Sequence, residues 1–159
     1  MTASVSAVRS PEELSGRFRA RGLKVTPQRQ CIFGVLALDH SHPTAESVHA
    51  AASARMPAIS LKTVYQTLND LAAMGEILQL DLGTGASRFD PNIEQRHHHL
   101  VCERCGKVRD LDADFGDLRI PPRARQGFRL GSAEITFRGL CATCTDESSI
   151  ITTPKERHG

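Results

Sequence analysis

Residues 97–105 read HHHLVCERC, and residues 141–144 read CATC. Within each Cys-x-x-Cys pair the short spacer lets two sulfur atoms face one ion, and four thiolates complete the tetrahedral shell of Zn2+. Such a shell leaves no open position for a substrate, so the two pairs predict a structural zinc site. We expect it to fasten a strand near residue 101 to a C-terminal strand. Its ligands are Cys102, Cys105, Cys141 and Cys144.

Two other kinds of site share this cysteine spacing. A redox-active dithiol usually opens a helix in a thioredoxin-like unit, and no such unit is apparent. An iron–sulfur cluster accepts the same spacing and stays open as an alternative. The fifth cysteine, Cys31, lies on the apolar side of a predicted helix and is interpreted as a small buried hydrophobe.

Histidines and carboxylates cluster around the first cysteine pair. Side chains alternate along an extended segment, so His97 and His99 share a face and His98 points away. Asp90 precedes the histidines and Asp110 follows them. These ligand types suit a divalent ion such as Fe2+ or Mn2+, and Zn2+, Co2+ and Ni2+ stay open. The sequence therefore predicts a second metal site beside the zinc.

The N-terminal half predicts four helices with recognisable ends. Ser or Thr caps, prolines at first helical positions and glycines past the last turn mark them. The predicted spans are approximately 11–22, 27–38, 44–57 and 60–75. The break before the third helix contains His42, a candidate further metal ligand, although taken alone it fits a capping or surface role better. Extended runs at 77–82 and 87–89 flank a Gly-Thr-Gly turn and indicate a hairpin.

Helices followed by a hairpin outline a winged helix-turn-helix, whose recognition helix enters the major groove of DNA. The fourth helix is amphipathic and carries a polar side. Residues 1–30 hold six Lys or Arg against two Glu, which suits phosphate contacts. A helical bundle that binds no nucleic acid is the alternative. The predicted DNA contacts are Lys62, Thr63, Gln66 and Thr67, with Arg19 and Arg29 from the basic stretch.

The C-terminal half predicts short strands and a tail. The expected strands are 99–102, 107–111 and 133–140, and Pro121-Pro122 would disrupt any helix between the last two. Residues 146–159 are polar, lack periodicity and are predicted to form a mobile tail.

The composition is that of a globular chain of 159 residues, with 40% hydrophobic and 24% charged residues. No apolar run approaches the roughly 18 residues of a membrane span. The first residues lack the apolar stretch of a secretory signal, so we expect a cytoplasmic protein. A reducing compartment favours metal ligation over disulfides for the five cysteines.

Taken together, these motifs resemble the ferric uptake regulator (Fur) family. The landmarks occur in the family's order and cover roughly residues 14–145. They are TPQR at 26–29, HPTA at 42–45, TVYQTL at 63–68, SRFD at 87–90, HHHLVCERCGK at 97–107 and CATC at 141–144.

The resemblance implies an α+β protein that forms a homodimer and binds a palindromic operator in double-stranded DNA. It implies a winged-helix DNA-binding domain at 1–86, a hinge at 87–95, an α/β dimerisation and metal-binding domain at 96–145, and the tail at 146–159. It also implies that Tyr65 contacts DNA. The regulatory Fe2+ or Mn2+ site that it implies consists of His42, Asp90, His97, His99 and Asp110.

The resemblance further favours the peroxide-responsive branch of the family. Iron sensors typically carry Glu at the positions of Asp90 and Asp110, whereas this branch carries Asp at both; Gln66 also stands where iron sensors often have Arg. The branch implies that H2O2 reacts at bound Fe2+, that His42 or His97 is oxidised, and that the repressor leaves its DNA. With Mn2+ bound the reaction fails. The oxidation is a sensing event, so we expect no enzyme.

Three features depart from the family pattern. One extra residue separates Asp90 from the histidines. Arg96 and Ala133 stand where a second accessory site has histidines. Residues 118–128, with two prolines, replace much of the usual dimerisation helix and predict a modified dimer interface.

Three alternatives differ in functional class. An iron-, zinc- or nickel-sensing repressor of metal uptake in the same family would share every motif except the aspartate pair. An intracellular metal-binding protein would not need the capped, polar-faced fourth helix. A zinc hydrolase would need an open metal position and a general base, and no His-Glu-x-x-His or comparable element is present.

Overall fold

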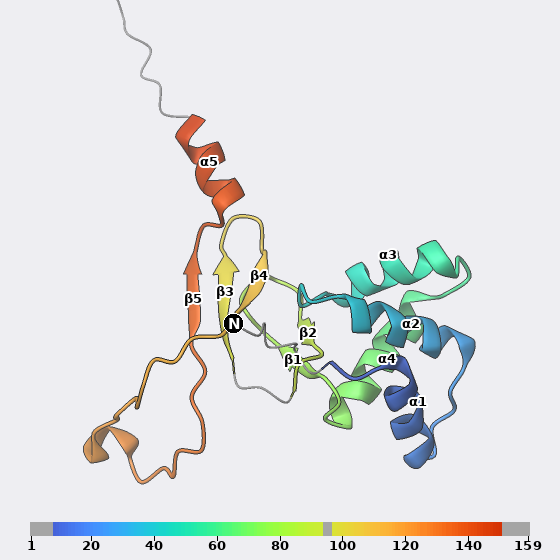
Figure 1. Cartoon of the computed structure of the whole chain (residues 1–159), viewed down its shortest axis with the longest axis horizontal. Coiled ribbons are helices and arrows are strands. Elements are labelled where there is room, and N and C mark those ends of the chain that lie inside the picture. Colours follow the sequence, from blue (N-terminus) through green and yellow to red (C-terminus); the bar gives the residue numbers. More distant parts are fainter. Residues whose placement is uncertain (1–7, 94–96, 151–159) are drawn as a thin grey trace, which may run out of the picture. The chain divides into compact units, whose positions relative to one another are not determined.

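A computed structural model describes residues 8–93 and 97–150 of the chain (Figure 1). The chain divides into two compact units, Met1–Arg96 and His97–Gly159. Among the described residues, no helix is both long and apolar enough to cross a membrane.

The first unit contains four helices whose ends follow local sequence signals. Ser10 opens the first of them with a capping box, in which it and Glu13 each accept a hydrogen bond from the other's backbone N–H. Thr26, Thr44 and Ser60 cap the others through their side-chain oxygens. The four predicted helices are confirmed as α1 (Pro11–Ala20), α2 (Pro27–Leu38), α3 (Ala45–Arg55) and α4 (Leu61–Ala73).

The core of this unit lies between the helices. Phe18 of α1 and Phe33 of α2 meet edge to face, with ring centroids 5.0 Å apart. The apolar stripe of α4 packs into the same core through Val64, Leu68 and Leu71. Burial of the stripe fixes the rotation of α4 about its axis, so its polar side faces outward.

A two-stranded wing completes the first unit. β1 (Leu78–Leu80) pairs antiparallel with β2 (Arg88–Asp90), with Leu78 opposite Asp90. Phe89 belongs to the core. The hinge predicted at 87–95 therefore begins too early, because residues 88–90 are a packed strand of the first unit. Residues 94–95 of that prediction lie outside the described residues.

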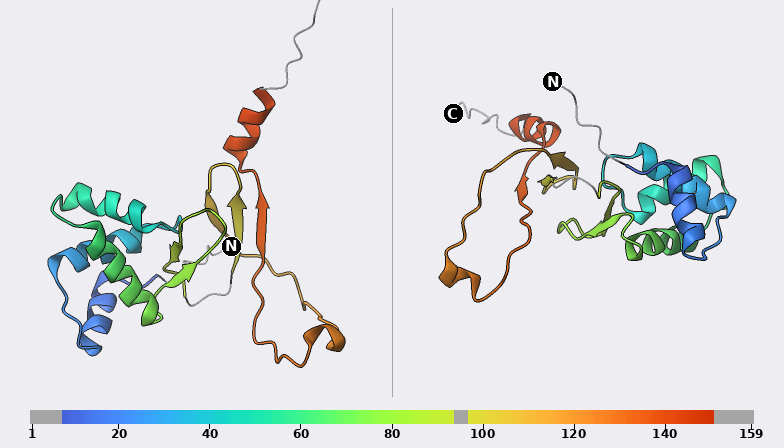
Figure 2. Two further views of the ribbon diagram at one scale, coloured as in Figure 1. Left: turned by 180° about the vertical axis from the view of Figure 1, so that it is seen from behind. Right: turned by 60° about the horizontal axis from the view of Figure 1, so that its bottom comes forward.

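The second unit is built on a three-stranded sheet in the order β4-β3-β5 (Figure 1). β3 (His98–Cys102) pairs antiparallel with β4 (Val108–Leu111) and parallel with β5 (Thr136–Gly139). All three predicted strands are confirmed. Between β4 and β5 the chain leaves the sheet as a long loop, which contains the short 3-10 helix η1 (Pro122–Arg125) (Figure 2).

One element of the second unit was not predicted. The helix α5 (Ala142–Ile150) begins inside the second cysteine pair. The predicted tail at 146–159 is therefore wrong for residues 146–150, which continue this helix. Residues 151–159 lie outside the described residues.

Candidate metal centres and DNA-binding face

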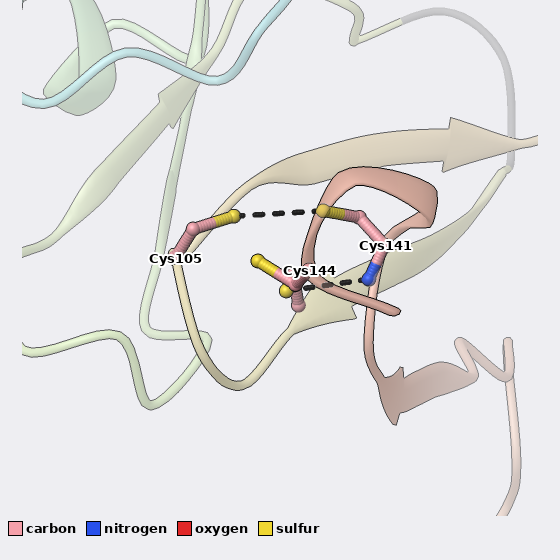
Figure 3. A group of neighbouring side chains, drawn as sticks. Cys105, Cys141 and Cys144 are labelled. Atoms are coloured by element: carbon pink, nitrogen blue, oxygen red, sulfur yellow. Dashed lines mark hydrogen bonds between the residues drawn. The ribbon is translucent and has the colours of Figure 1, made fainter. Parts of the chain in front are cut away.

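The four predicted zinc ligands converge at one end of the sheet. Cys102 ends β3. Cys105 lies in the turn toward β4, Cys141 immediately precedes α5 and Cys144 lies in its first turn (Figure 3). Their sulfur atoms all lie within 4.8 Å of one another. The Sγ atoms of Cys105 and Cys141 are 3.7 Å apart. Tetrahedral Zn–S bonds of about 2.3 Å place neighbouring sulfurs roughly 3.8 Å apart, so the group fits Zn2+.

Backbone N–H groups prepare this cluster for thiolate chemistry. The N–H groups of Cys105 and Cys141 lower the pKa of Cys102 to about 6, and the Cys141 N–H lies 3.3 Å from its Sγ. The N–H of Cys144 lowers the pKa of Cys141. Burial, followed by contact with the neighbouring sulfurs, raises the pKa of Cys144 to about 12. Without a cation, the cluster limits its negative charge by keeping some thiols protonated. A bound cation would compensate that charge and allow all four cysteines to be thiolates.

In the first unit, two of the predicted regulatory ligands lie together. Nε2 of His42 is 3.2 Å from Oδ2 of Asp90, and both side chains are almost completely buried. Two hydrogen bonds join the loop to the wing: the backbone N–H of Phe89 donates to the carbonyl of Pro43 at 2.9 Å, and the guanidinium of Arg88 donates to the carbonyl of His42 at 3.2 Å. These bonds hold the imidazole beside the end of β2.

The backbone at His42 is unusual for a residue with a side chain. Its φ of 55° lies in the left-handed region, which costs on the order of 1–3 kcal/mol for a non-glycine residue. Asp90 is also oriented locally, because its Oδ1 accepts the N–H of Asn92 at 2.8 Å. A strained backbone conformation such as that of His42 is typical of ligand sites.

In the second unit, three predicted ligands share one face of the sheet. His99 on β3 stands opposite Asp110 on β4, with Nε2 3.9 Å from Oδ1. Nε2 of His97 lies 3.3 Å from the same oxygen. His98 turns to the other face, as the alternation predicts, where its Nδ1 accepts the N–H of Ile135 at 3.0 Å. Imidazole and carboxylate donors grouped in this way fit a divalent first-row metal.

Sequence reasoning missed one residue beside this group. Oε1 of Glu134 lies 2.9 Å from Nδ1 of His99, on the ring nitrogen opposite the one that faces Asp110. Glu134 precedes β5, and the parallel pairing of β3 with β5 brings it to His99. Carboxylates in this position often fix the ring orientation of a metal-binding histidine. No local pattern in the sequence marks Glu134, because the contact depends on a distant strand pairing.

The predicted DNA contacts differ in their accessibility. Lys62, Tyr65 and Gln66 on α4 are exposed, and so is Arg19 on α1; Thr63 is half-buried. Thr67 is fully buried and donates its hydroxyl hydrogen to the carbonyl of Thr63 at 2.8 Å. The prediction that Thr67 contacts DNA is therefore corrected: it lies on the inner side of α4.

Arg29 also acts within the unit. Its guanidinium lies 3.1 Å from Oδ2 of Asp70, donates to the carbonyl of Lys24 at 2.7 Å and covers the ring of Phe18. These contacts tie α2 to α1 and α4. The guanidinium is thus engaged in packing, and a DNA contact by Arg29 stays a prediction.

The exposed tyrosine of α4 has a partner on α3. The Tyr65 hydroxyl donates to Oε1 of Glu46 at 2.5 Å. This hydrogen bond lowers the pKa of Glu46 and raises the pKa of Tyr65 above its usual value. The pair fixes the direction of the tyrosine ring on the outer face of the helical unit.

The family model described as the ferric uptake regulator family matches residues 20–138. The chain belongs to this family. The peroxide-responsive repressor PerR of Staphylococcus epidermidis is 33% identical, over 87% of this chain and 92% of its own length. The resemblance inferred from the motifs is thereby confirmed.

Solved structures of Fur-family proteins have the same fold. The ferric uptake regulator of Vibrio cholerae is 29% identical, with a TM-score of 0.64 over 80% of this chain and 99% of its own. That of Helicobacter pylori is 23% identical, with a TM-score of 0.68 over 87% of this chain and 95% of its own, and this likeness concerns the fold alone. Fur-family proteins are dimeric DNA-binding repressors. The α+β fold, with a winged-helix domain followed by a dimerisation domain, is confirmed.

Proposed function

We propose that this Fur-family chain is a metal-dependent transcriptional repressor that senses H2O2 through oxidation of a histidine ligand. One observation carries the proposal: both carboxylates beside the candidate histidines are aspartates, Asp90 next to His42 and Asp110 next to His97 and His99. The peroxide-responsive branch has Asp at both positions. The Staphylococcus epidermidis relative, which is itself named as peroxide-responsive, supports this choice.

The regulatory metal would take ligands from both units. The first unit offers one imidazole and one carboxylate, and the second offers two imidazoles and one carboxylate. The group of the second unit alone, two imidazoles and one carboxylate, would leave coordination positions of Fe2+ or Mn2+ open, and the two ligands of the first unit could fill them. We therefore propose that His42, Asp90, His97, His99 and Asp110 bind one ion together.

Such an ion would act as the switch for DNA binding. A ligand that binds one arrangement of two units better than the others shifts the population toward it. In a cytoplasmic homodimer, the arrangement that the metal favours would present the two α4 helices to successive major grooves of a palindromic operator. Lys62, Tyr65, Gln66 and Arg19 are the exposed residues proposed to meet the DNA.

Oxidation would remove a ligand and so release the DNA. Bound Fe2+ supplies the electron chemistry that reduces H2O2, which Mn2+ does not. In the net step one oxygen atom of H2O2 becomes bonded to the ring carbon between the two nitrogens of His42 or His97. The hydrogen of that carbon moves to a ring nitrogen, and the second oxygen leaves as water. The histidine loses two electrons and H2O2 gains two.

The test compares Fe2+-loaded and Mn2+-loaded protein on DNA selected from a random-sequence pool by the Mn2+ form. We expect H2O2 to release only the Fe2+ form, with one added oxygen atom on the peptide that contains His42 or His97. The matched variant Asp110→Glu should keep metal-dependent binding and lose much of the peroxide response. Release of neither form would instead support an iron-, zinc- or nickel-sensing repressor of metal uptake. Absence of metal-dependent DNA binding would leave a metal-binding protein without a DNA function.

A further inference from the structure

The segment before α1 pairs with the chain just beyond the wing. Val8 forms an antiparallel bridge with Asn92, two residues after β2 ends. Asn92 is buried, and its N–H donates to Oδ1 of Asp90 at 2.8 Å. This bond fixes the rotation of the Asp90 carboxylate, whose other oxygen, Oδ2, faces His42. The N-terminal segment is therefore paired with the residue that orients a proposed metal ligand.

An ion pair with little exposure to water holds this segment in place. Arg9 follows Val8, and its Nε lies 2.5 Å from Oε2 of Glu76. The Glu76 side chain is 8% exposed and the Arg9 side chain is 18% exposed. Opposite charges attract more strongly where little water screens them, so this pair constrains the segment more than a surface pair would.

The partner carboxylate has a fixed place at the end of α4. Gly75 follows the last turn with a φ of 73°, and its N–H donates to the carbonyl of Ala72 at 3.0 Å. The N–H of Glu76 donates to the carbonyl of Leu71 at 2.9 Å. These two bonds form the Schellman arrangement that ends many helices. Arg9 thus ties the N-terminal segment to the end of the predicted recognition helix.

We propose that Arg9 is a positioning residue for the metal ligand Asp90. Its ion pair with Glu76 keeps Val8 paired with Asn92. Asn92 in turn holds the carboxylate of Asp90 in its orientation. The inference rests on the proposed function, in which Asp90 binds the regulatory ion. Groups that orient a ligand affect metal affinity without touching the ion.

The test measures the Mn2+ affinity of the full-length, zinc-containing protein by electron paramagnetic resonance of the free ion. Arg9→Gln removes the charge and should weaken Mn2+ binding by about ten-fold, the lower end of the loss that follows when a metal ligand loses an orienting partner. Arg9→Lys should keep most of the affinity, because an ammonium group can still pair with Glu76.

Arg17→Gln is the matched control. Nε of Arg17 lies 3.7 Å from Oε1 of the same Glu76, but Arg17 stands on α1, outside the bridged segment, and its side chain is 53% exposed. This variant should bind Mn2+ like the unchanged chain. Before Mn2+ is added, the N–H of Asn92 should exchange with solvent faster in Arg9→Gln and at the original rate in Arg17→Gln.

A second background separates positioning from general stabilisation of the first unit. Adding Arg9→Gln to Asp90→Ala should cause no further loss of Mn2+ affinity, because Arg9 acts through Asp90. A residue that only stabilises the unit would lower the affinity by the same factor in both backgrounds.

The outcomes distinguish this inference from the proposed function. Unchanged affinity in Arg9→Gln, an equal loss in Arg17→Gln, or equal losses in the two backgrounds would overturn the positioning role and leave the proposed repressor function intact. If Asp90→Ala alone leaves the Mn2+ affinity unchanged, Asp90 is not a ligand. That result would overturn both the five-ligand site and the role of Arg9.

Discussion

The carboxylate of Asp90 lies 3.2 Å from the imidazole of His42, a residue whose backbone has a left-handed conformation. The two residues belong to different parts of the first unit, the loop before α3 and the end of the wing. Hydrogen bonds from β2 to the backbone of His42 and Pro43 join those parts. The wing therefore does more than flank the helices, because it positions a candidate metal ligand.

Replacing His42 should affect the proposed regulatory metal site and leave the proposed zinc site unchanged. His42→Ala is expected to weaken Mn2+-dependent DNA binding by ten-fold or more, since a ligand is lost, and to leave the zinc content unchanged. The measurement is DNA affinity as a function of Mn2+ concentration, together with metal analysis. His40→Ala is the matched control, because His40 is a nearby exposed histidine. Unchanged Mn2+ dependence in His42→Ala would remove this residue from the site.

Removing one cysteine of the tetrathiolate cluster should unfold the second unit. Cys102→Ser is expected to abolish zinc binding. The sheet would then be poorly stabilised, because Val101 and Val108 are the large aliphatic residues buried in the described part of this unit. Hydrogen exchange of peptides from β3 and β5 measures the loss of protection. Cys31→Ser should keep the zinc, since Cys31 packs in the helical unit. A protected, zinc-free sheet in Cys102→Ser would contradict a structural role for the metal.

The contact between Glu134 and His99 leads to a prediction for metal affinity. Glu134→Ala should weaken Mn2+ binding by about 10–100-fold, the usual effect of losing a carboxylate that orients a ligand histidine. Nitrogen chemical shifts of the His99 ring, measured before Mn2+ is added, should change as well. Glu103→Ala removes an exposed carboxylate of the same unit and serves as the control. If neither the affinity nor the ring shifts respond to Glu134→Ala, the contact has no orienting role.

The hydrogen bond between Tyr65 and Glu46 can be followed directly, because the chain has one tyrosine and no tryptophan. The carboxylate accepts from the phenol and repels the phenolate, so the pKa of Tyr65 is raised. Glu46→Gln should lower that pKa toward the usual value of about 10. Ultraviolet absorbance during a pH titration measures this shift. Glu12→Gln, at an exposed glutamate of α1, should leave the titration unchanged; equal curves for all three proteins would show that the bond does not persist in solution.

Local signals in the sequence were sufficient for most secondary structure. Helix signals act over one or two turns, so they predict the helices without knowledge of the tertiary fold. Examples are the caps Thr26, Thr44 and Ser60 and the apolar period of α4. The same locality led to errors. Residues 146–149 are polar and residues 146–150 show no apolar period, but the helix that contains them starts at the second cysteine pair, which the sheet positions.

The sequence by itself determined the helices, most of the strands, the grouping of the four cysteines and the family, because each depends on spacing along a short segment or on motifs in a given order. Only the tertiary structure decided which face each side chain occupies and which distant residues meet. Burial of the α4 stripe turned Thr67 inward, and packing onto Phe18 engaged Arg29. The parallel pairing of β3 with β5 brought Glu134 to His99 and left Leu100 beside Phe137 on an exposed face. Such pairings join residues far apart in the chain, and their register follows from the burial of whole faces, which no local pattern encodes.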